Sequence, residues 1–312
     1  MASDLGLNSE LLTNLFTAPE GPEGWLQHAL SEEQVIQFKE LGYLHGIQAL
    51  NSEQINALSE ELQEMVDPEH EGNEFFYEYH SNESEDPETA VFHALGAWRV
   101  RPAFHDVLWN PAFTMAAYQL LGANFRLFHD QLFSKPAKHG GVVAWHQDFS
   151  YWTWTEPMSH LTCWIGLDDV DKGNGCMYYI PNSHRWGLLE KESLTGDMDA
   201  IREKLTEAQV ADFEKKVPVE MKAGEASFHH PLLMHGSYEN NSERGRRATI
   251  INVFSDGVVS NREDDGSNAP GADNYPRITK GEKMEGTYYP LLMKAQESLG
   301  ELIDKVPTID SV

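Results

Sequence analysis

Residues 125–148, FRLFHDQLFSKPAKHGGVVAWHQD, contain two short apolar runs separated by a Pro and two Gly residues. From this point onward the chain consists largely of such runs, divided by Gly, Pro, Asn and Asp. Short strands at this spacing are typical of an antiparallel sandwich or barrel. The predicted strands cover residues 125–134, 142–148, 160–168, 176–180, 217–221, 225–230 and 246–255.

The part of the chain before residue 125 predicts helices instead. Ser31 and Gln34 match a capping box that begins an amphipathic helix, and Gly42 ends it. A second amphipathic helix is predicted from Ser52 to about residue 66. A third is predicted over residues 111–121, with a Pro in its first turn.

The composition limits the classes of partner. The chain has 312 residues, with 23 Lys and Arg against 50 Asp and Glu, for a formal net charge of −27. Such a charge repels phosphate backbones and anionic lipid headgroups, so neither nucleic acid nor a membrane surface is an expected partner. We see no apolar run of membrane-spanning length, no signal peptide and no peroxisomal address. With only two cysteines, the expected compartment is the reducing cytoplasm.

The segment Trp145-His146-Gln147-Asp148 ends the second predicted strand. Residues two apart on a strand point to the same face, so His146 and Asp148 can reach one metal ion while Gln147 points away. A single His-x-Asp pattern occurs by chance in many proteins. The pattern becomes informative because a second histidine follows later in the chain, within a recognisable motif of its own.

That histidine is His235, within FHHPLLMHGS at 228–237. Two histidines and one carboxylate form the facial triad favoured by non-haem Fe(II). Arg246, on the next predicted strand, can clamp a carboxylate through two charge-assisted hydrogen bonds, and Ser237 can add a hydroxyl. A zinc-dependent hydrolase could use the same three ligands but does not need Arg246 and Ser237. A non-catalytic binding protein would need none of them.

These motifs together resemble the phytanoyl-CoA dioxygenase family, a branch of the Fe(II)- and 2-oxoglutarate-dependent oxygenases. The resemblance extends from about Leu30 to about Phe254. The segments that carry it are HQD at 146–148, TCWIGLDD at 162–169, GNGC at 173–176, IPNSH at 180–184, HHPLLMHGS at 229–237 and the arginine pair at 246–247.

The resemblance implies a mainly β fold, a double-stranded β-helix (jelly roll, cupin-like) with N-terminal and inserted α-helices. We therefore predict a single oxygenase domain. Residues 255–287, rich in Gly, Asn, Asp and Pro, are expected to form a long loop or a lid. The predicted parts of the 1–312 domain are a helical part at about 1–122, a jelly-roll core at about 123–256 with a helical insertion at about 190–216, and a C-terminal loop and tail at about 257–312.

The resemblance also implies roles for individual residues. His146, Asp148 and His235 would hold Fe(II), and O2 would be the oxidant. The residues implied for 2-oxoglutarate are Arg246, Ser237, Trp164 and Gln131. Lys135 recurs in relatives, either at the site or as a strand-end residue. Arg99 and Arg101 correspond loosely to a basic residue near the cosubstrate or substrate.

Three positions bear on how far the resemblance holds. The family usually has Pro-Gly-Ser-His where this chain has Asn182 in place of Gly. Asn tolerates the left-handed conformation, so the turn is expected to survive. Arg246 is preferred over Arg247 on spacing alone, because a shift of one residue turns a side chain to the other strand face. Related halogenases have Ala or Gly at the position of Asp148, so halogenation is disfavoured.

Aromatic residues directly after the iron motif are candidates for the substrate site. Phe149, Tyr151, Trp152 and Trp154 are either core packing or a wall that stacks on an amine or a flat apolar group. Trp152 is the preferred substrate contact, with Phe149, Arg99 and Lys135 as further candidates. His229 and His230 are expected to be hydrogen-bonded core residues rather than ligands.

The predicted reaction is oxidative decarboxylation of 2-oxoglutarate to succinate and CO2, coupled to hydroxylation of an unactivated C–H bond. Desaturation, epoxidation and cyclisation remain open as alternative outcomes. The expected substrate is a small metabolite such as an amino acid, a betaine-like solute, a phosphonate or a natural-product intermediate. Acyl-CoA fits less well, because no concentrated basic patch is visible for its phosphates. The oligomeric state, monomer or homodimer, stays open.

Overall fold

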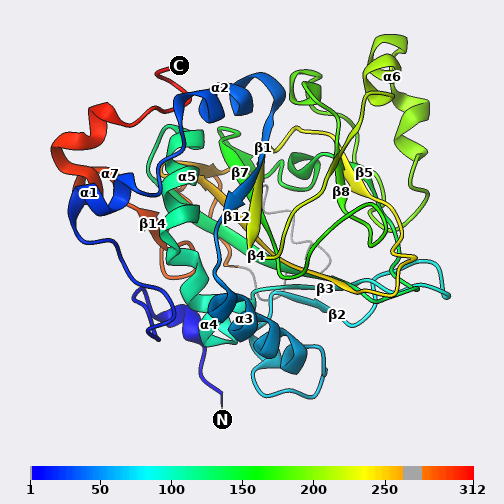
Figure 1. The fold of residues 1–312 in the computed structure, drawn as a ribbon, viewed down its shortest axis with the longest axis horizontal. Helices are drawn as coiled ribbons and strands as arrows, with labels where there is room; N and C mark the ends of the chain where they lie inside the picture. Colours follow the sequence, from blue (N-terminus) through cyan, green and yellow to red (C-terminus); the bar gives the residue numbers. More distant parts are fainter. Residues whose placement is uncertain (1, 263–275) are drawn as a thin grey trace.

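A large antiparallel sheet faces a smaller one in the computed structural model, which describes residues 2–262 and 276–312 (Figure 1). The larger sheet runs, in order, through β1 (Tyr43–Gln48), β10 (Glu225–His229), β7 (His160–Gly166), β12 (Arg246–Ser255), β4 (Phe125–Lys135), β3 (Phe92–Leu95) and β2 (Glu78–His80), and β14 (Leu291–Met293) pairs with β4. The smaller sheet runs through β5 (Val143–His146), β11 (His235–Ser237), β8 (Met177–Tyr179) and β9 (Val217–Val219). A short ladder joins β6 (Thr155–Glu156) to β13 (Val259–Ser260).

The chain passes back and forth between the facing sheets. From β4 it crosses to β5, returns to β7, crosses to β8 and β9, returns to β10, crosses to β11 and returns to β12. This alternation of antiparallel strands between facing sheets is a jelly roll, so the predicted fold class is confirmed.

Side-chain alternation along the central strands separates a core on the helix side from a core between the sheets. Cys163 and Ile165 of β7 pack on the helix side, while Trp164 packs between the sheets. On β12, Ile251 belongs to the helix side and Ile250 to the space between the sheets. The period of two therefore determines which residues of these strands face the interior of the jelly roll.

Helices from the N-terminal part cover the outer face of the larger sheet (Figure 1). Ser31 caps α2 through the predicted capping box, and Gly42 ends it in a left-handed conformation. The cap of α3 is Asn51, one residue before the predicted start. The helices are α1 (Gly21–Leu26), α2 (Glu32–Leu41), α3 (Ser52–Met65), α4 (Pro102–Asp106), α5 (Pro111–Leu121), α6 (Glu207–Phe213) and α7 (Ala295–Leu299).

Several strands lie where none was predicted. β1 follows α2 directly and adds an edge to the larger sheet beside β10. Its sequence, YLHGIQ, contains a glycine and no clear alternation, which explains why the pattern missed it. β2 and β3 extend the opposite edge of the same sheet. The predicted loop or lid at 255–287 includes residues 263–275, which lie outside the described residues.

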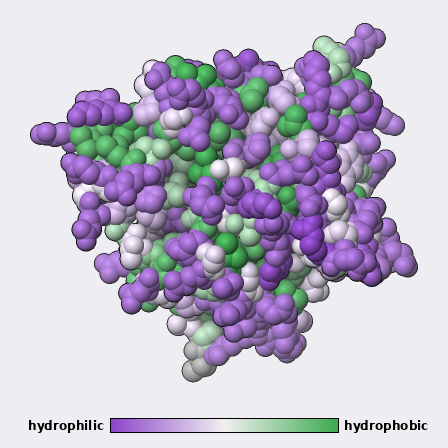
Figure 2. Space-filling view, in the orientation of Figure 1, coloured by the Kyte–Doolittle hydropathy of each residue, from purple (hydrophilic) through white to green (hydrophobic). Residues whose placement is uncertain are grey.

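Polar side chains cover most of the face shown in Figure 2, with smaller hydrophobic areas between them. This agrees with the excess of acidic residues in the sequence. Among the helices of the described residues, none combines the length and apolarity needed to cross a bilayer.

The turn at Asn182 takes the left-handed conformation that the sequence predicted, with φ of 67°. We expect Asn182→Gly to keep the stability of the protein, whereas Asn182→Ala should lower the free energy of unfolding by about 1–2 kcal/mol, because a Cβ is unfavourable there. Chemical denaturation of both variants measures this difference. Equal stability of the Ala and Gly variants would contradict it.

Candidate active site

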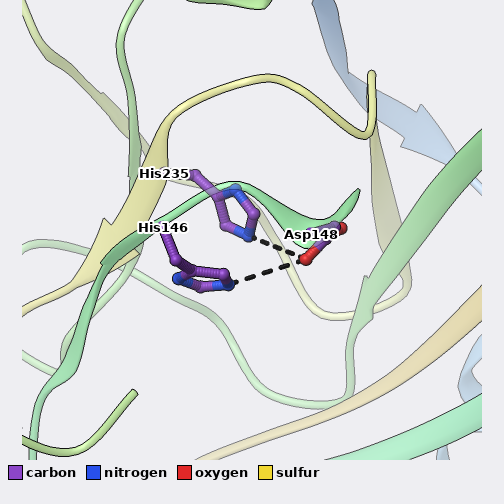
Figure 3. A group of neighbouring side chains, drawn as sticks. All are labelled: His146, Asp148 and His235. Atoms are coloured by element: carbon purple, nitrogen blue, oxygen red, sulfur yellow. Dashed lines mark ion pairs between the residues drawn. The ribbon is translucent and has the colours of Figure 1, made fainter. Parts of the chain in front are cut away.

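His146, Asp148 and His235 meet where β5 and β11 lie side by side. His146 ends β5, and its register partner on β11 is His235. Nε2 of His146 lies 3.6 Å from Oδ1 of Asp148, and Nε2 of His235 lies 3.5 Å from the same oxygen (Figure 3). All three side chains are buried, and their ligand atoms lie within 4.8 Å of one another. This set of donors could hold one metal ion.

The second nitrogen of each imidazole is already engaged. Nδ1 of His146 lies 2.7 Å from the carbonyl oxygen of Ala144, and Nδ1 of His235 lies 2.9 Å from that of Leu233. A carbonyl oxygen only accepts hydrogen bonds, so the proton of each ring is on Nδ1. Each Nε2 is therefore left with the lone pair that a metal ligand needs.

Asp148 is held by hydrogen bonds to its other oxygen. Oδ2 accepts from Oγ1 of Thr162 at 2.6 Å and lies 3.0 Å from Nε2 of His229. Nδ1 of His229 in turn lies 3.1 Å from the hydroxyl of Tyr179. These contacts turn Oδ1 toward the two histidines. His229 is the hydrogen-bonded core residue that the sequence predicted.

The charges around the triad favour a deprotonated ligand set. Burial raises the pKa of Asp148, but the neighbouring histidines, His235 first, lower it well below its ordinary value. Burial, and then the neighbouring His146, lower the pKa of His235 well below that of a free imidazole. A carboxylate with neutral imidazoles is the protonation state in which metals bind.

Asp148 reaches this position from a turn and not from a strand. β5 ends at His146, and Asp148 begins a 3₁₀ turn, so the expectation that both residues share one strand face is wrong in its local detail. Gln147 does point away from the triad, as predicted. Its amide nitrogen donates to the carbonyl oxygens of Gly187 and Leu232, at 2.9 Å each.

Arg246 is buried between the sheets, at 2% exposure. Its guanidinium lies over Trp164, 5.4 Å from the ring centroid, and Nη1 donates to the carbonyl of Gly175 at 3.3 Å. Nε is buried without a hydrogen-bond partner. Arg247 faces the other way and pairs with Asp168 at 2.7 Å. Of the two arginines, Arg246 is therefore the one turned toward the interior.

A second buried cation lies next to Arg246. Lys135 donates from Nζ to Oγ of Ser237 at 2.5 Å and to the carbonyl of Tyr238 at 2.9 Å. Burial, reinforced by the charge of Arg246, lowers the pKa of Lys135 well below its usual value, and burial lowers that of Arg246 to about 10. An anion bound here would offset the cost of burying these charges.

A cavity of about 480 Å³ connects these groups. The predicted site residues on its lining are His146, Asp148, His235, Arg246, Ser237, Trp164, Gln131 and Trp152. Thr162 and His229 line it as well, together with Tyr151 and Trp154. The volume is typical of sites for small molecules.

The matches to known proteins agree with this geometry. The family model of phytanoyl-CoA dioxygenase matches residues 38–248. The chain belongs to the phytanoyl-CoA dioxygenase family. A rice relative, phytanoyl-CoA dioxygenase 1, is 28% identical over 260 residues, which cover 72% of this chain and 89% of the relative. The phytanoyl-CoA dioxygenase of Arabidopsis thaliana is 33% identical over 170 residues, which cover 54% of this chain and 57% of the relative.

Solved structures share the fold. The 2-oxoglutarate-dependent carbocyclase SnoK from nogalamycin biosynthesis superposes with a TM-score of 0.68 at 23% identity, covering 89% of this chain and all of SnoK. EctD from S. alaskensis, solved with 2-oxoglutarate and 5-hydroxyectoine, superposes with a TM-score of 0.63 at 18% identity. That match covers 91% of this chain and 93% of EctD.

As a phytanoyl-CoA dioxygenase family member, the chain is a dioxygenase that uses Fe(II), 2-oxoglutarate and O2. The donor set of two imidazoles and one carboxylate fits Fe(II). The unpartnered Nε of buried Arg246 fits a carboxylate of 2-oxoglutarate.

Three predicted substrate residues, Arg99, Phe149 and Lys135, are not on the cavity lining. The guanidinium of Arg99 pairs with Asp4 at 2.6 Å and lies between the rings of Tyr77 and Tyr288. It ties the N-terminal segment to the fold and does not reach the cavity lining. Phe149 packs in the same hydrophobic cluster as Trp152. Lys135 reaches the lining only through Ser237.

The sequence did not predict the hydrogen bond that the Thr162 hydroxyl donates to Asp148. We expect Thr162→Val to weaken Fe(II) binding by about 10–100-fold, because Asp148 loses a hydrogen bond that orients it. Thr249→Val is the matched control, since the Thr249 hydroxyl is buried on a neighbouring strand without a hydrogen-bond partner. Equal Fe(II) affinity of the two variants in an anaerobic titration would refute the role of Thr162.

Proposed function

We propose that this dioxygenase hydroxylates an unactivated C–H bond of a small metabolite, with release of succinate and CO2. In this proposal His146, Asp148 and His235 hold Fe(II), and Arg246 with Ser237 binds the distal carboxylate of 2-oxoglutarate. Trp164, whose ring lies beneath Arg246, forms a wall of the cosubstrate pocket. Bound iron with 2-oxoglutarate supplies the oxidising chemistry.

One observation carries the proposal. The converging triad and a buried arginine with an unpartnered Nε lie on the lining of a single cavity. A hydrolase would use the triad but would have no use for a buried cation set back from it. A binding protein would need neither group.

The residues of the chain do the binding and positioning in this reaction. Arg246 and Ser237 orient the cosubstrate by charge and hydrogen bonding. Buried aromatic residues around the triad, among them Trp152 and Phe128, exclude water from the place where the C–H bond is oxidised. Trp152 is on the cavity lining, so it is the preferred substrate contact.

An anaerobic titration tests the proposal. Fe(II) is added to metal-free protein, 2-oxoglutarate follows, and the visible charge-transfer band of the chelate is recorded. We expect the band to appear with one Fe(II) and one 2-oxoglutarate bound per chain. A protein that binds Fe(II) but forms no band would contradict the assignment of the cosubstrate site.

A further inference from the structure

Two carboxylates face each other on the cavity lining, apart from the triad. The carboxylates of Glu78 and Glu83 and a ring nitrogen of His93 lie within 4.8 Å of one another, and all three residues line the cavity. Glu78 and His93 come from neighbouring strands, β2 and β3, and Glu83 from the loop between them. The side chains of the two glutamates are only 26% and 22% exposed.

One carboxylate of this group pairs with the histidine. Oε2 of Glu83 and Nδ1 of His93 form a buried ion pair, 2.8 Å apart. His93 is 5% exposed, and it lines the cavity. The group presents two carboxylates to the cavity, and carboxylates accept strong hydrogen bonds from a positively charged ligand.

Within the buried part of the group, two carboxylates meet one imidazole. The cationic groups that act on Glu83 are His93 and His80. Burial lowers the pKa of His93, but Glu83 and then Glu78 raise it above its ordinary value overall. A protonated His93 offsets one carboxylate. Glu78 pairs with His80, 2.7 Å away, whose side chain is 40% exposed.

Aromatic rings line the same cavity beside the acids. Tyr151, Trp152, Trp154 and Phe133 contribute to the lining, and the ring of Phe133 stacks on His93 at 4.2 Å between centroids. Faces of aromatic rings attract organic cations, most strongly where water is excluded. Carboxylates and rings together therefore favour a ligand with a positive charge on an organic group.

A polar wall connects this group to the triad. Oε1 of Gln131 lies 3.1 Å from Nε2 of His93, and Nε2 of Gln131 lies 3.1 Å from Nε2 of His129. The charge of Asp148 acts on His129. A molecule that fills the cavity can thus meet the acidic group at one end and the candidate metal site at the other.

We propose that the acidic group formed by Glu78, Glu83 and His93 binds the protonated amine of the substrate, so that the substrate is a small aliphatic amine or amino acid. This inference rests on the proposed function. Lys191 and Arg262 also line the cavity and can pair with a carboxylate of the same molecule. The two carboxylates repel the phosphates of an acyl-CoA.

Binding of four-carbon probes tests the proposal in the anaerobic complex with Fe(II) and 2-oxoglutarate. The probes are butylamine, 4-aminobutyrate, 1-butanol and butyrate, measured by ligand-observed NMR. We expect both amines to bind at least about tenfold more tightly than the alcohol and butyrate. Glu83→Gln and, separately, Glu78→Gln should remove this preference. Glu88→Gln, an exposed acid in the same loop, should keep it.

Retention of the charge-transfer band in Glu83→Gln shows that the variant is folded and holds its cosubstrate. Tighter binding of 1-butanol or butyrate than of the amines would overturn the proposal, as would an amine preference that survives both glutamate substitutions. A second Mn²⁺ per chain that is lost in Glu83→Gln would instead make the group a metal site. Absence of the band from the unmutated protein would contradict the proposed function and not this inference.

Discussion

We expect Asp148→Ala to abolish turnover and to weaken Fe(II) binding by more than about 100-fold. Loss of a residue that only hydrogen-bonds to a metal ligand costs up to about 100-fold, and loss of the ligand itself should cost more. Asp148 supplies the carboxylate of the candidate triad, and its Oδ1 lies within 3.6 Å of Nε2 of both histidines. Without it, the two imidazoles remain as the only ligands of the triad. The measurements are Fe(II) affinity under anaerobic conditions and succinate release in air.

The control for this variant is Asp67→Ala, which removes an exposed carboxylate after α3. It should bind Fe(II) and release succinate like the unmutated protein. If Asp148→Ala kept its iron and its succinate release, the ligand assignment would be wrong.

The second large effect is expected at Arg246. Replacing it with Ala should weaken 2-oxoglutarate binding by about 2–5 kcal/mol, or roughly 30- to 5,000-fold, because the distal carboxylate loses a buried charged partner. Fe(II) affinity should change little, since the triad is untouched. Arg246→Lys should recover only part of the affinity, because an ammonium cannot make the paired hydrogen bonds of a guanidinium.

Arg247→Ala provides the comparison, because it removes the same kind of side chain from the next position. Arg247 faces the other side of β12 and pairs with Asp168. We expect its 2-oxoglutarate affinity to match that of the unmutated protein, as read from the charge-transfer band. Equal losses in both variants would show that the effect at Arg246 comes from the strand and not from the cosubstrate.

Local hydrogen bonding made parts of the fold predictable. The capping box of Ser31 and Gln34 needs only residues three apart, and the turn at Asn182 needs only a residue that tolerates positive φ. The alternation of side chains along a strand also predicted that Arg246 and Arg247 face opposite sides, because it depends only on neighbouring residues. β1 escaped prediction because its edge position beside β10 comes from contacts with residues far along the chain.

In the candidate site, too, some residues could be predicted from the sequence and others could not. The triad could be predicted because its histidines and carboxylate stand in recognisable motifs, although Asp148 turned out to lie in a turn after β5. Thr162 begins the recognisable segment TCWIGLDD, but nothing in that segment indicates its contact with Asp148, which exists only once β7 lies beside the turn. Arg99 looked like a site residue, but Asp4 from the start of the chain binds its guanidinium.

Short-range patterns in this chain thus specify strands, caps, turns and the identity of the metal-binding motifs, because each depends on a few neighbouring residues. The packing of distant strands specifies what surrounds those motifs. It brings Arg246 beside Lys135, places Thr162 against Asp148 and brings Glu83 against His93. Such pairings depend on long-range contacts and on the exclusion of water, and the spacing of residues along a chain encodes neither.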